Sequence, residues 1–213
     1  MDKSKIEAAY NDTFSGLTMY YRDCNLSEAL IAKYQVNQII MERGFTDVSS
    51  FAEGLSKNLR YAIASNCAVN MGQINPDVAK FGFHLIAAPS YYKVLDIYTV
   101  GQQTQILLLN FNEEHRDIFE ASTSNIEEQV IAMGREGLNK KIQMSPNDVL
   151  NGEEWAERTQ FPIGMSDRGD FFLSDTTDTP QTPITPELQT PNTASKITAP
   201  EKTKSFWKRL FGK

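Results

Sequence analysis

The strongest constraint on the fold is a pair of β-rich runs, residues 91–100 and 103–111, joined by a two-residue turn that contains Gly101. Two such runs with so short a connection are typical of an antiparallel β-hairpin. The second run includes four consecutive aliphatic residues, so both of its faces are apolar. A strand of this kind needs cover on both sides, and we predict that it lies centrally in a sheet, with Leu107 and Leu109 deeply buried.

The first run of the hairpin carries charged residues among apolar ones. Lys93 and Thr99 indicate a side that faces water. Asp96 is surrounded by apolar neighbours, and we expect it either to pair with Lys93 or to face solvent at a sheet edge.

The segment before the hairpin has mostly helical patterns. Residues 3–10 predict a weak helix, and residues 25–44 a stronger one, because Asn25 and Glu28 have the spacing of an N-cap and its capping-box partner. Residues 46–55 place apolar side chains at i, i+3, i+4 and i+7, which predicts a short amphipathic helix.

Strand and helix signals alternate along the rest of the body. Residues 59–64 and 81–87 predict strands, and residues 113–121, 124–138 and 145–155 predict helices. The fold class is therefore α+β, with N-terminal helices, an antiparallel β-meander that includes the hairpin near 91–111, and C-terminal helices before a disordered tail.

Composition divides the chain into three parts. Residues 1–174 hold 15 Lys and Arg against 23 Asp and Glu, a net charge of −8, and form the predicted acidic globular domain. Residues 175–203 are rich in Thr and Pro and have few apolar side chains, so we predict a disordered linker. Residues 204–213 are aromatic and basic, and form an amphipathic surface if they are helical.

The C-terminal peptide, residues 204–213, is the predicted interaction site of the chain. Its length is below what an isolated helix needs in water, so it should fold only on contact with something. Three occupants remain open: the acidic body itself, an anionic membrane surface, or a hydrophobic groove on a partner protein. The residues predicted to bind the partner or membrane are Phe206, Trp207, Lys208, Arg209, Leu210 and Phe211.

Other features bear on compartment and partners. The acidic body is poorly suited to nucleic acid, because phosphate backbones repel it. No run of apolar residues is long enough to cross a membrane or to form a secretory leader, so a cytoplasmic location, possibly extended to a membrane periphery by the peptide, is expected. Cys24 and Cys67 are expected as buried, reduced thiols, and no structural zinc site or other cofactor is expected.

Catalytic signatures are scarce in this sequence. It has no nucleophile elbow, phosphate loop, dinucleotide-binding glycine pattern or zinc-protease motif. His84 falls within a predicted strand, and Cys67 could act as a nucleophile only if the fold brought a base to it. His115 lies in an acidic cluster, residues 113–117, whose adjacent side chains would point in different directions on a helix, so that run alone makes no metal site.

The leading hypothesis from the sequence is a non-enzymatic intracellular interaction or adaptor protein, recruited by its C-terminal peptide. One version is an inhibitor- or immunity-like protein whose acidic surface covers a basic partner. The alternative is a small cytosolic hydrolase that uses His84, His115 or Cys67 with nearby acids. A concave pocket that gathers two of these residues would favour the enzyme, and a flat body with those residues dispersed would favour the binder.

Overall fold

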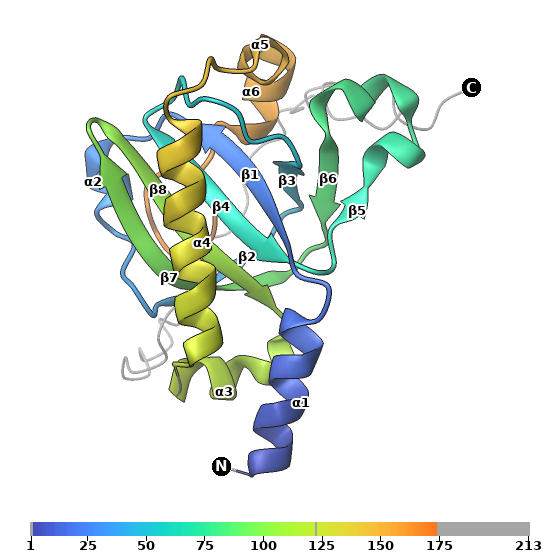
Figure 1. Ribbon diagram of the computed structural model, residues 1–213, viewed down its shortest axis with the longest axis vertical. Helices are drawn as coiled ribbons and strands as arrows, with labels where there is room; N and C mark the ends of the chain where they lie inside the picture. The colour runs from blue at the N-terminus through green and yellow to red at the C-terminus, as the bar shows by residue number, and fades with distance from the viewer. Residues whose placement is uncertain (1, 122, 174–213) are drawn as a thin grey trace, which may run out of the picture. The chain divides into compact units, whose positions relative to one another are not determined.

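A mixed sheet of eight strands forms the centre of the protein, in the order β2-β7-β8-β4-β1-β3-β6-β5. The computed structural model describes residues 2–121 and 123–173, and Figure 1 shows the helices around this sheet. The strands are β1 Thr18–Cys24, β2 Ile39–Glu42, β3 Thr46–Ser49, β4 Leu59–Ser65, β5 Val69–Asn70, β6 Phe83–Ile86, β7 Ser90–Val100 and β8 Gln103–Phe111. The α-helices are α1 Lys3–Phe14, α2 Glu28–Ile31, α3 Arg116–Ala121, α4 Asn125–Lys141, α5 Asp148–Asn151 and α6 Glu153–Thr159, and the 3-10 helices are η1 Met71–Gln73, η2 Pro76–Phe81 and η3 Glu113–His115. The α+β class predicted from the sequence is confirmed.

The hairpin predicted from the sequence is present as β7 and β8. The two strands pair antiparallel from Tyr91 opposite Phe111 to Val100 opposite Gln103, with a register shift at Asp96. Gly101 in the turn has φ +63°, a left-handed conformation that costs glycine little because it has no Cβ.

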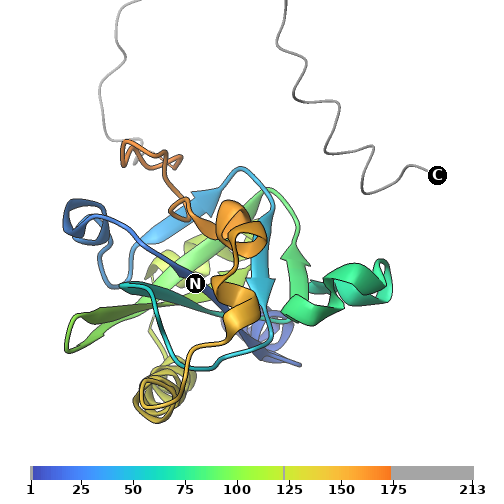
Figure 2. The same ribbon diagram turned by 90° about the horizontal axis from the view of Figure 1, so that it is seen from above.

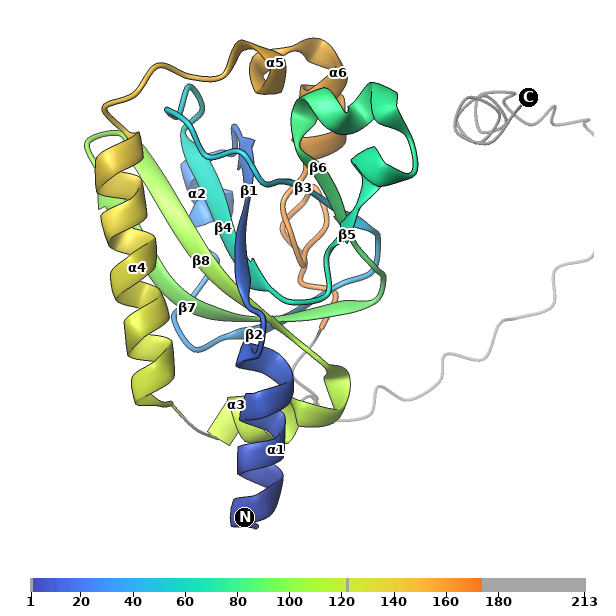
Figure 3. The ribbon, with the colours of Figure 1, turned by 45° about the vertical axis from the view of Figure 1, so that its right-hand side comes forward.

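Both faces of β8 are buried, as the apolar run predicts. Leu107 is 1% exposed and Leu109 is 0% exposed, and both face the helix layer. Ile106 and Leu108 belong to the other core, on the face of the sheet away from α4. Figure 3 shows α4 lying along one side of β7 and β8, with α1 and α3 at the lower end. Because successive side chains of β8 point to opposite faces of the sheet, the strand contributes to two separate hydrophobic cores.

Two of the predicted N-terminal helices are wrong: one is much shorter than predicted, and the other is absent. Only Glu28–Ile31 is helical within residues 25–44, capped by Ser27 rather than Asn25, and Ile39–Glu42 forms β2. Residues 46–55 contain β3 and an irregular segment instead of a helix. The reason is tertiary: β2 pairs with β7 and β3 with β1 and β6, and these ladders override the local helical spacing.

The sheet also differs from the predicted antiparallel meander in one strand pair. β4 runs parallel to β8, with Tyr61 opposite Ile106, while every other pair in the sheet is antiparallel. The hairpin is therefore inserted between β2 and β4 rather than following β4 as the next strand in line. The weak helix near residues 3–10 extends to Phe14, and the strands at 59–64 and 81–87 are confirmed as β4 and β6.

The charged residues of β7 are buried rather than exposed to water. Lys93 Nζ lies 2.9 Å from Glu127 Oε2 on α4, and the two side chains are 1% and 4% exposed. Asp96 accepts two hydrogen bonds of 2.7 Å from Arg135 on α4. The expectation of a solvated side at Lys93, with Asp96 paired to it or facing solvent, is wrong, because α4 brings a countercharge to each.

The predicted linker 175–203 and peptide 204–213 lie outside the described residues. Among residues 2–121 and 123–173, no helix is both long and apolar enough to cross a membrane.

Candidate functional site

The structure separates the three residues that the sequence offered for catalysis. His84 lies on β6, where its Nδ1 is 2.9 Å from the carbonyl oxygen of Gly82 and its ring packs on Tyr20 at 4.8 Å between centroids. Cys67 lies between β4 and β5, and His115 lies at the end of η3. His84 therefore has packing and hydrogen bonds of an ordinary structural residue.

Cys67 lies in a cleft of about 560 Å³, which we call the Cys67 cleft. Its thiol is exposed, not buried as expected from the sequence, whereas Cys24 is 2% exposed and burial raises the pKa of that thiol to about 12. The cleft is lined by Asp12, Thr13, Asn66, Cys67, Ile86, Ala87, Pro89, Ser90, Tyr91, Asn110, Phe111, Asn112 and Glu113. No lysine or arginine is among these lining residues, so the charge of the cleft is acidic.

Hydrogen bonds in the Cys67 cleft hold the thiol to an amide rather than to a base. Cys67 Sγ donates to Asn110 Oδ1 at 2.9 Å, and Ser65 Oγ donates to the same oxygen at 2.8 Å. Asn110 Nδ2 in turn donates to the carbonyl oxygen of Tyr91 at 3.1 Å. In the part of the chain that the structure describes, no histidine hydrogen-bonds to the thiol, so the Cys67–histidine pair of the hydrolase alternative is not assembled.

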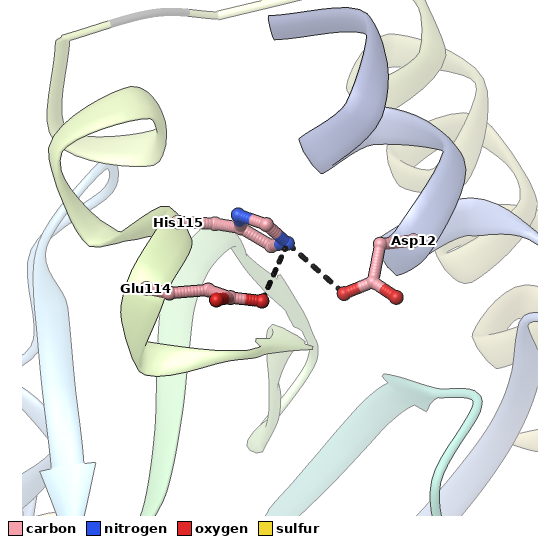
Figure 4. A group of neighbouring side chains, drawn as sticks. All are labelled: Asp12, Glu114 and His115. Carbon is pink, nitrogen blue, oxygen red and sulfur yellow. Dashed lines mark hydrogen bonds and ion pairs between the residues drawn. The ribbon is translucent and has the colours of Figure 1, made fainter. Parts of the chain in front are cut away.

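Three side chains of types that can ligate a metal ion lie close together (Figure 4), and one of them, Asp12, also lines the Cys67 cleft. His115 Nε2 lies 2.9 Å from Asp12 Oδ2 and 3.7 Å from Glu114 Oε1. Asp12 belongs to α1, and the other two belong to η3. We call Asp12, Glu114 and His115 the carboxylate–histidine triad.

A second cleft, of about 360 Å³, lies where β1, β2 and β3 meet the segment after α6. We call it the Arg22 cleft. It contains two guanidinium groups and three phenylalanines, of which Phe45 is 56% and Phe161 55% exposed. The cleft is lined by Arg22, Glu42, Phe45, Asp47, Arg158, Phe161, Pro162, Met165, Ser166, Asp167 and Phe172.

Arg22 is a buried cation without an ion pair among the described residues. The residue is 6% exposed. Its Nε donates to the carbonyl oxygen of Thr159 at 3.3 Å and its Nη2 to that of Phe161 at 2.8 Å. No hydrogen bond joins Nη1 to any residue that the structure describes. Since buried arginines are normally paired, this guanidinium has unused capacity for an anion.

Two of the three carboxylates of the Arg22 cleft, those of Glu42 and Asp47, by contrast already have partners. Both oxygens of Glu42 accept backbone N–H groups, from Gly44 and Gly164, at 2.8 Å each. Asp47 Oδ2 accepts from Arg158 Nη1 at 3.3 Å. Burial raises the pKa of the Asp47 carboxyl, while Arg158 and Arg22 act in the opposite direction. Asp47 is thus the ionisable group of the cleft whose proton affinity the fold has changed.

Sequence reasoning missed Arg22, Asp47 and Asp12. Arg22 carries a weak signal, a cation inside the strand-like run Tyr20–Cys24, but its partners Thr159 and Phe161 are about 140 positions away. The predicted site residues from Phe206 to Phe211 lie outside the described residues, so their role stays a prediction.

Comparisons with known proteins identify similar folds but no family. No family model and no curated protein matches the chain. Part of the fold is similar to the type III effector XopAI of Xanthomonas axonopodis pv. citri, at 12% identity and a TM-score of 0.39, over 47% of this chain and 46% of that one. It is also similar to the ADP-ribosyltransferase HopU1 of Pseudomonas syringae, at 12% identity and a TM-score of 0.39, over 45% of each chain. The Vis toxin of Vibrio splendidus, another ADP-ribosyltransferase, is 14% identical with a TM-score of 0.36, over 46% of this chain and 49% of that one.

These likenesses cover about half of each chain, and at such identities and TM-scores they transfer no residue or activity to this protein. They do stand against the hypothesis of a non-enzymatic interaction or adaptor protein, including its inhibitor- or immunity-like version, because HopU1 and Vis are enzymes. That hypothesis is corrected. The body is not flat, since the described residues form clefts of about 360 and 560 Å³, but neither of these clefts gathers two of His84, His115 and Cys67.

Proposed function

We propose that the chain binds a nucleotide-type ligand, an aromatic heterocycle that carries phosphate, in the Arg22 cleft. The observation that carries the proposal is the buried Arg22 guanidinium, which hydrogen-bonds only backbone carbonyls among the described residues. A guanidinium fork matches the geometry of a phosphate group, and a charge-assisted hydrogen bond is strongest where water is excluded.

The aromatic residues of the Arg22 cleft support the proposal that the ligand contains an aromatic heterocycle. Phe45 and Phe161 expose more than half of their surface, although such side chains usually lose most of their exposure on folding. A flat heterocycle that stacks on one of these rings would bury that surface, and base–aromatic stacking contributes roughly 1–3 kcal/mol. The two features together favour a ligand with both a ring and an anion.

Asp47 gives the cleft a group for proton transfer. Its raised pKa keeps part of the carboxyl protonated at a pH where an exposed aspartate is ionised. A carboxyl of this kind beside a bound phosphate or sugar fits general acid–base chemistry on the ligand. We therefore extend the proposal to turnover of the nucleotide, with Asp47 as the acid or base.

The direct test is isothermal titration of the full chain with AMP, ADP, ATP, GTP and NAD⁺ at low salt. We expect at least one of these probes to bind with a stoichiometry of one. Arg22→Lys keeps the charge and loses the fork, and should weaken binding by about 10- to 100-fold, as expected for charge-assisted hydrogen bonds of roughly 1.5–3 kcal/mol.

The matched control is Arg168→Gln, which removes an exposed cation from the same segment but not from the cleft lining. It should bind as the wild type does. Equal loss in both variants, or no binding of any probe at millimolar concentration, overturns the proposal. Chromatography of the bound probe after incubation tests turnover, and Asp47→Asn should abolish any product while leaving binding in place.

The cytoplasmic location expected from the sequence stays a prediction, as does its extension to a membrane periphery. Only that extension depends on residues 204–213, whose binding to an anionic surface or a protein groove is a separate proposal, testable by Trp207 fluorescence with anionic vesicles.

A further inference from the structure

The carboxylate–histidine triad joins two segments that are far apart in the chain. Its closest contact, between His115 Nε2 and Asp12 Oδ2, spans 103 positions of sequence. Its three ligand atoms, one from each side chain, lie within 4.8 Å of one another. Zinc takes ligands at about 2.0–2.2 Å, so two tetrahedral ligand atoms lie roughly 3.4 Å apart. The measured distances of 2.9 and 3.7 Å lie on either side of that value.

Packing holds the two segments in place. Tyr10 on α1 stacks with Phe119 on α3 at a centroid distance of 5.5 Å, and Phe14 packs on the same ring in a tilted arrangement at 6.4 Å. Asn66 Nδ2 donates to the carbonyl oxygens of Asp12 and Ser15, at 2.6 and 3.1 Å, and so fixes the end of α1. The backbone positions of the triad are therefore set by the fold rather than by the triad itself.

The side chains combine a fixed ligand with two adjustable ones. The side chain of His115 is 13% exposed, whereas those of Asp12 and Glu114 are 58% and 67% exposed. The carboxylates can thus move by the few tenths of an ångström that an ion requires, while the imidazole stays in place.

The adjoining cleft supplies an independent observation. Thr13, the neighbour of Asp12, lines the Cys67 cleft and is 2% exposed, and its hydroxyl has no hydrogen-bond partner among the described residues. A buried hydroxyl without a partner costs about 1–3 kcal/mol, so the fold keeps an unsatisfied polar group next to Asp12. Asp12 and Glu113 make the cleft acidic, and none of its lining residues is a cation.

We propose that Asp12, Glu114 and His115 bind one divalent transition-metal ion beside the Cys67 cleft, whose lining includes Asp12. The site lies apart from the Arg22 cleft and does not depend on the proposed function. One imidazole and two carboxylates suit Zn²⁺ or Mn²⁺ better than Mg²⁺, which prefers oxygen ligands and water. Three protein ligands leave room for a water or substrate atom, which is the pattern of catalytic rather than structural zinc sites.

The experiment is isothermal titration of the untagged, chelator-treated full chain with ZnCl₂, MnCl₂ and MgCl₂ in turn. We expect one equivalent of Zn²⁺ to bind, Mn²⁺ to bind more weakly, and Mg²⁺ to give no heat at the same concentration. His115→Gln and Asp12→Asn should each weaken Zn²⁺ binding by at least about tenfold, since even residues behind the ligands cost that much.

Two controls separate the triad from other zinc ligands. His84→Gln removes the other histidine of the chain, and Cys67→Ser removes the exposed thiol of the cleft. Both should bind Zn²⁺ as the wild type does. The proposal is overturned if Cys67→Ser loses the binding, if His115→Gln and Asp12→Asn retain it, or if the wild type binds no transition metal. Asp12 is exposed, so Asp12→Asn keeps the test valid if His115→Gln does not fold.

Discussion

Lys93 and Arg22 are both buried cations, yet the fold treats them differently. Lys93 points into the layer between β7 and α4 and meets the carboxylate of Glu127 at 2.9 Å. Arg22 points into the layer between β1 and the segment after α6, and its guanidinium meets only carbonyl oxygens among the described residues. The first charge is neutralised within the chain, and the second has capacity left for a ligand.

The difference follows from the chemistry of burial. A charge removed from water costs several kcal/mol unless a partner of opposite sign and hydrogen bonds compensate it. Burial raises the pKa of the Glu127 carboxyl, and its hydrogen bond and ion pair with Lys93 oppose that change. The Lys93–Glu127 pair therefore connects two elements, whereas Arg22 marks a place where something else should bind.

The largest change in stability should come from breaking the Lys93–Glu127 pair. Glu127→Gln removes the carboxylate that lies 2.9 Å from the buried Lys93 ammonium, and we expect the free energy of unfolding to fall by about 3–5 kcal/mol. Urea denaturation followed by circular dichroism measures this. Glu128→Gln, one position along and exposed, should change stability by less than about 0.5 kcal/mol. A loss below about 1 kcal/mol for Glu127→Gln would show that the pair does not stabilise α4 on the sheet.

Arg22→Gln should lower the free energy of unfolding by less than Glu127→Gln does, but it should strongly weaken ligand binding. The lost hydrogen bonds to Thr159 and Phe161 predict a decrease of roughly 1–3 kcal/mol in the free energy of unfolding. Saturating nucleotide should raise the melting temperature of the wild type and leave that of the variant unchanged. Equal shifts in melting temperature for both proteins would show that Arg22 does not bind the ligand. The proposed difference between Arg22 and Lys93 would then be wrong.

A third test uses the pH dependence of stability. The folded-state pKa of Asp47 is raised above its unfolded value near 3.9, so between the two values the folded protein binds more protons than the unfolded one. The wild type should therefore lose stability from this residue as the pH rises through that window. Asp47→Asn should show a shallower fall than the wild type, whereas Asp167→Asn, an exposed cleft residue, should keep the wild-type slope. Parallel curves for wild type and Asp47→Asn would contradict the burial effect.

The smallest expected change in stability is that of Phe45→Ala. The side chain is 56% exposed, so stability should stay within about 0.5 kcal/mol of the wild type. Nucleotide affinity should nevertheless fall by about tenfold, if the ring stacks with roughly 1–3 kcal/mol. Val36→Ala, 50% exposed and outside the lining of the Arg22 cleft, is the control for both measurements. Unchanged nucleotide affinity in Phe45→Ala would show that the ligand does not stack on this ring.

Local signals predicted the elements whose pairing partners are close in sequence. The hairpin needs only the turn at Gly101, and α4 needs only Ser124 as its cap, whose hydroxyl accepts from Glu127 N at 3.3 Å. The failures are β2 and β3, since their ladders form with β7 and with β1 and β6. Short segments with helical spacing become strands when a sheet edge offers hydrogen bonds that the isolated segment lacks.

The candidate sites were less predictable than the fold. Cys67, His84 and His115 were singled out for their side-chain chemistry, yet the structure connects none of them to another. Asp12 comes to His115, and Thr159 and Phe161 come to Arg22, over separations that leave no trace in local spacing. Pairwise geometry of this kind is a property of the packed chain and cannot be inferred from residue type.

The sequence by itself determined the α+β class, the hairpin and the burial of Leu107 and Leu109, because hydrophobic period, turn chemistry and helix caps act over a few residues. The tertiary structure decided which charges are neutralised and which stay open. Glu127 reaches Lys93 because α4 packs on β7, while the chain after α6 brings Arg22 only carbonyl oxygens. The physical reason is that electrostatic pairing depends on distance in space, which local sequence patterns do not specify.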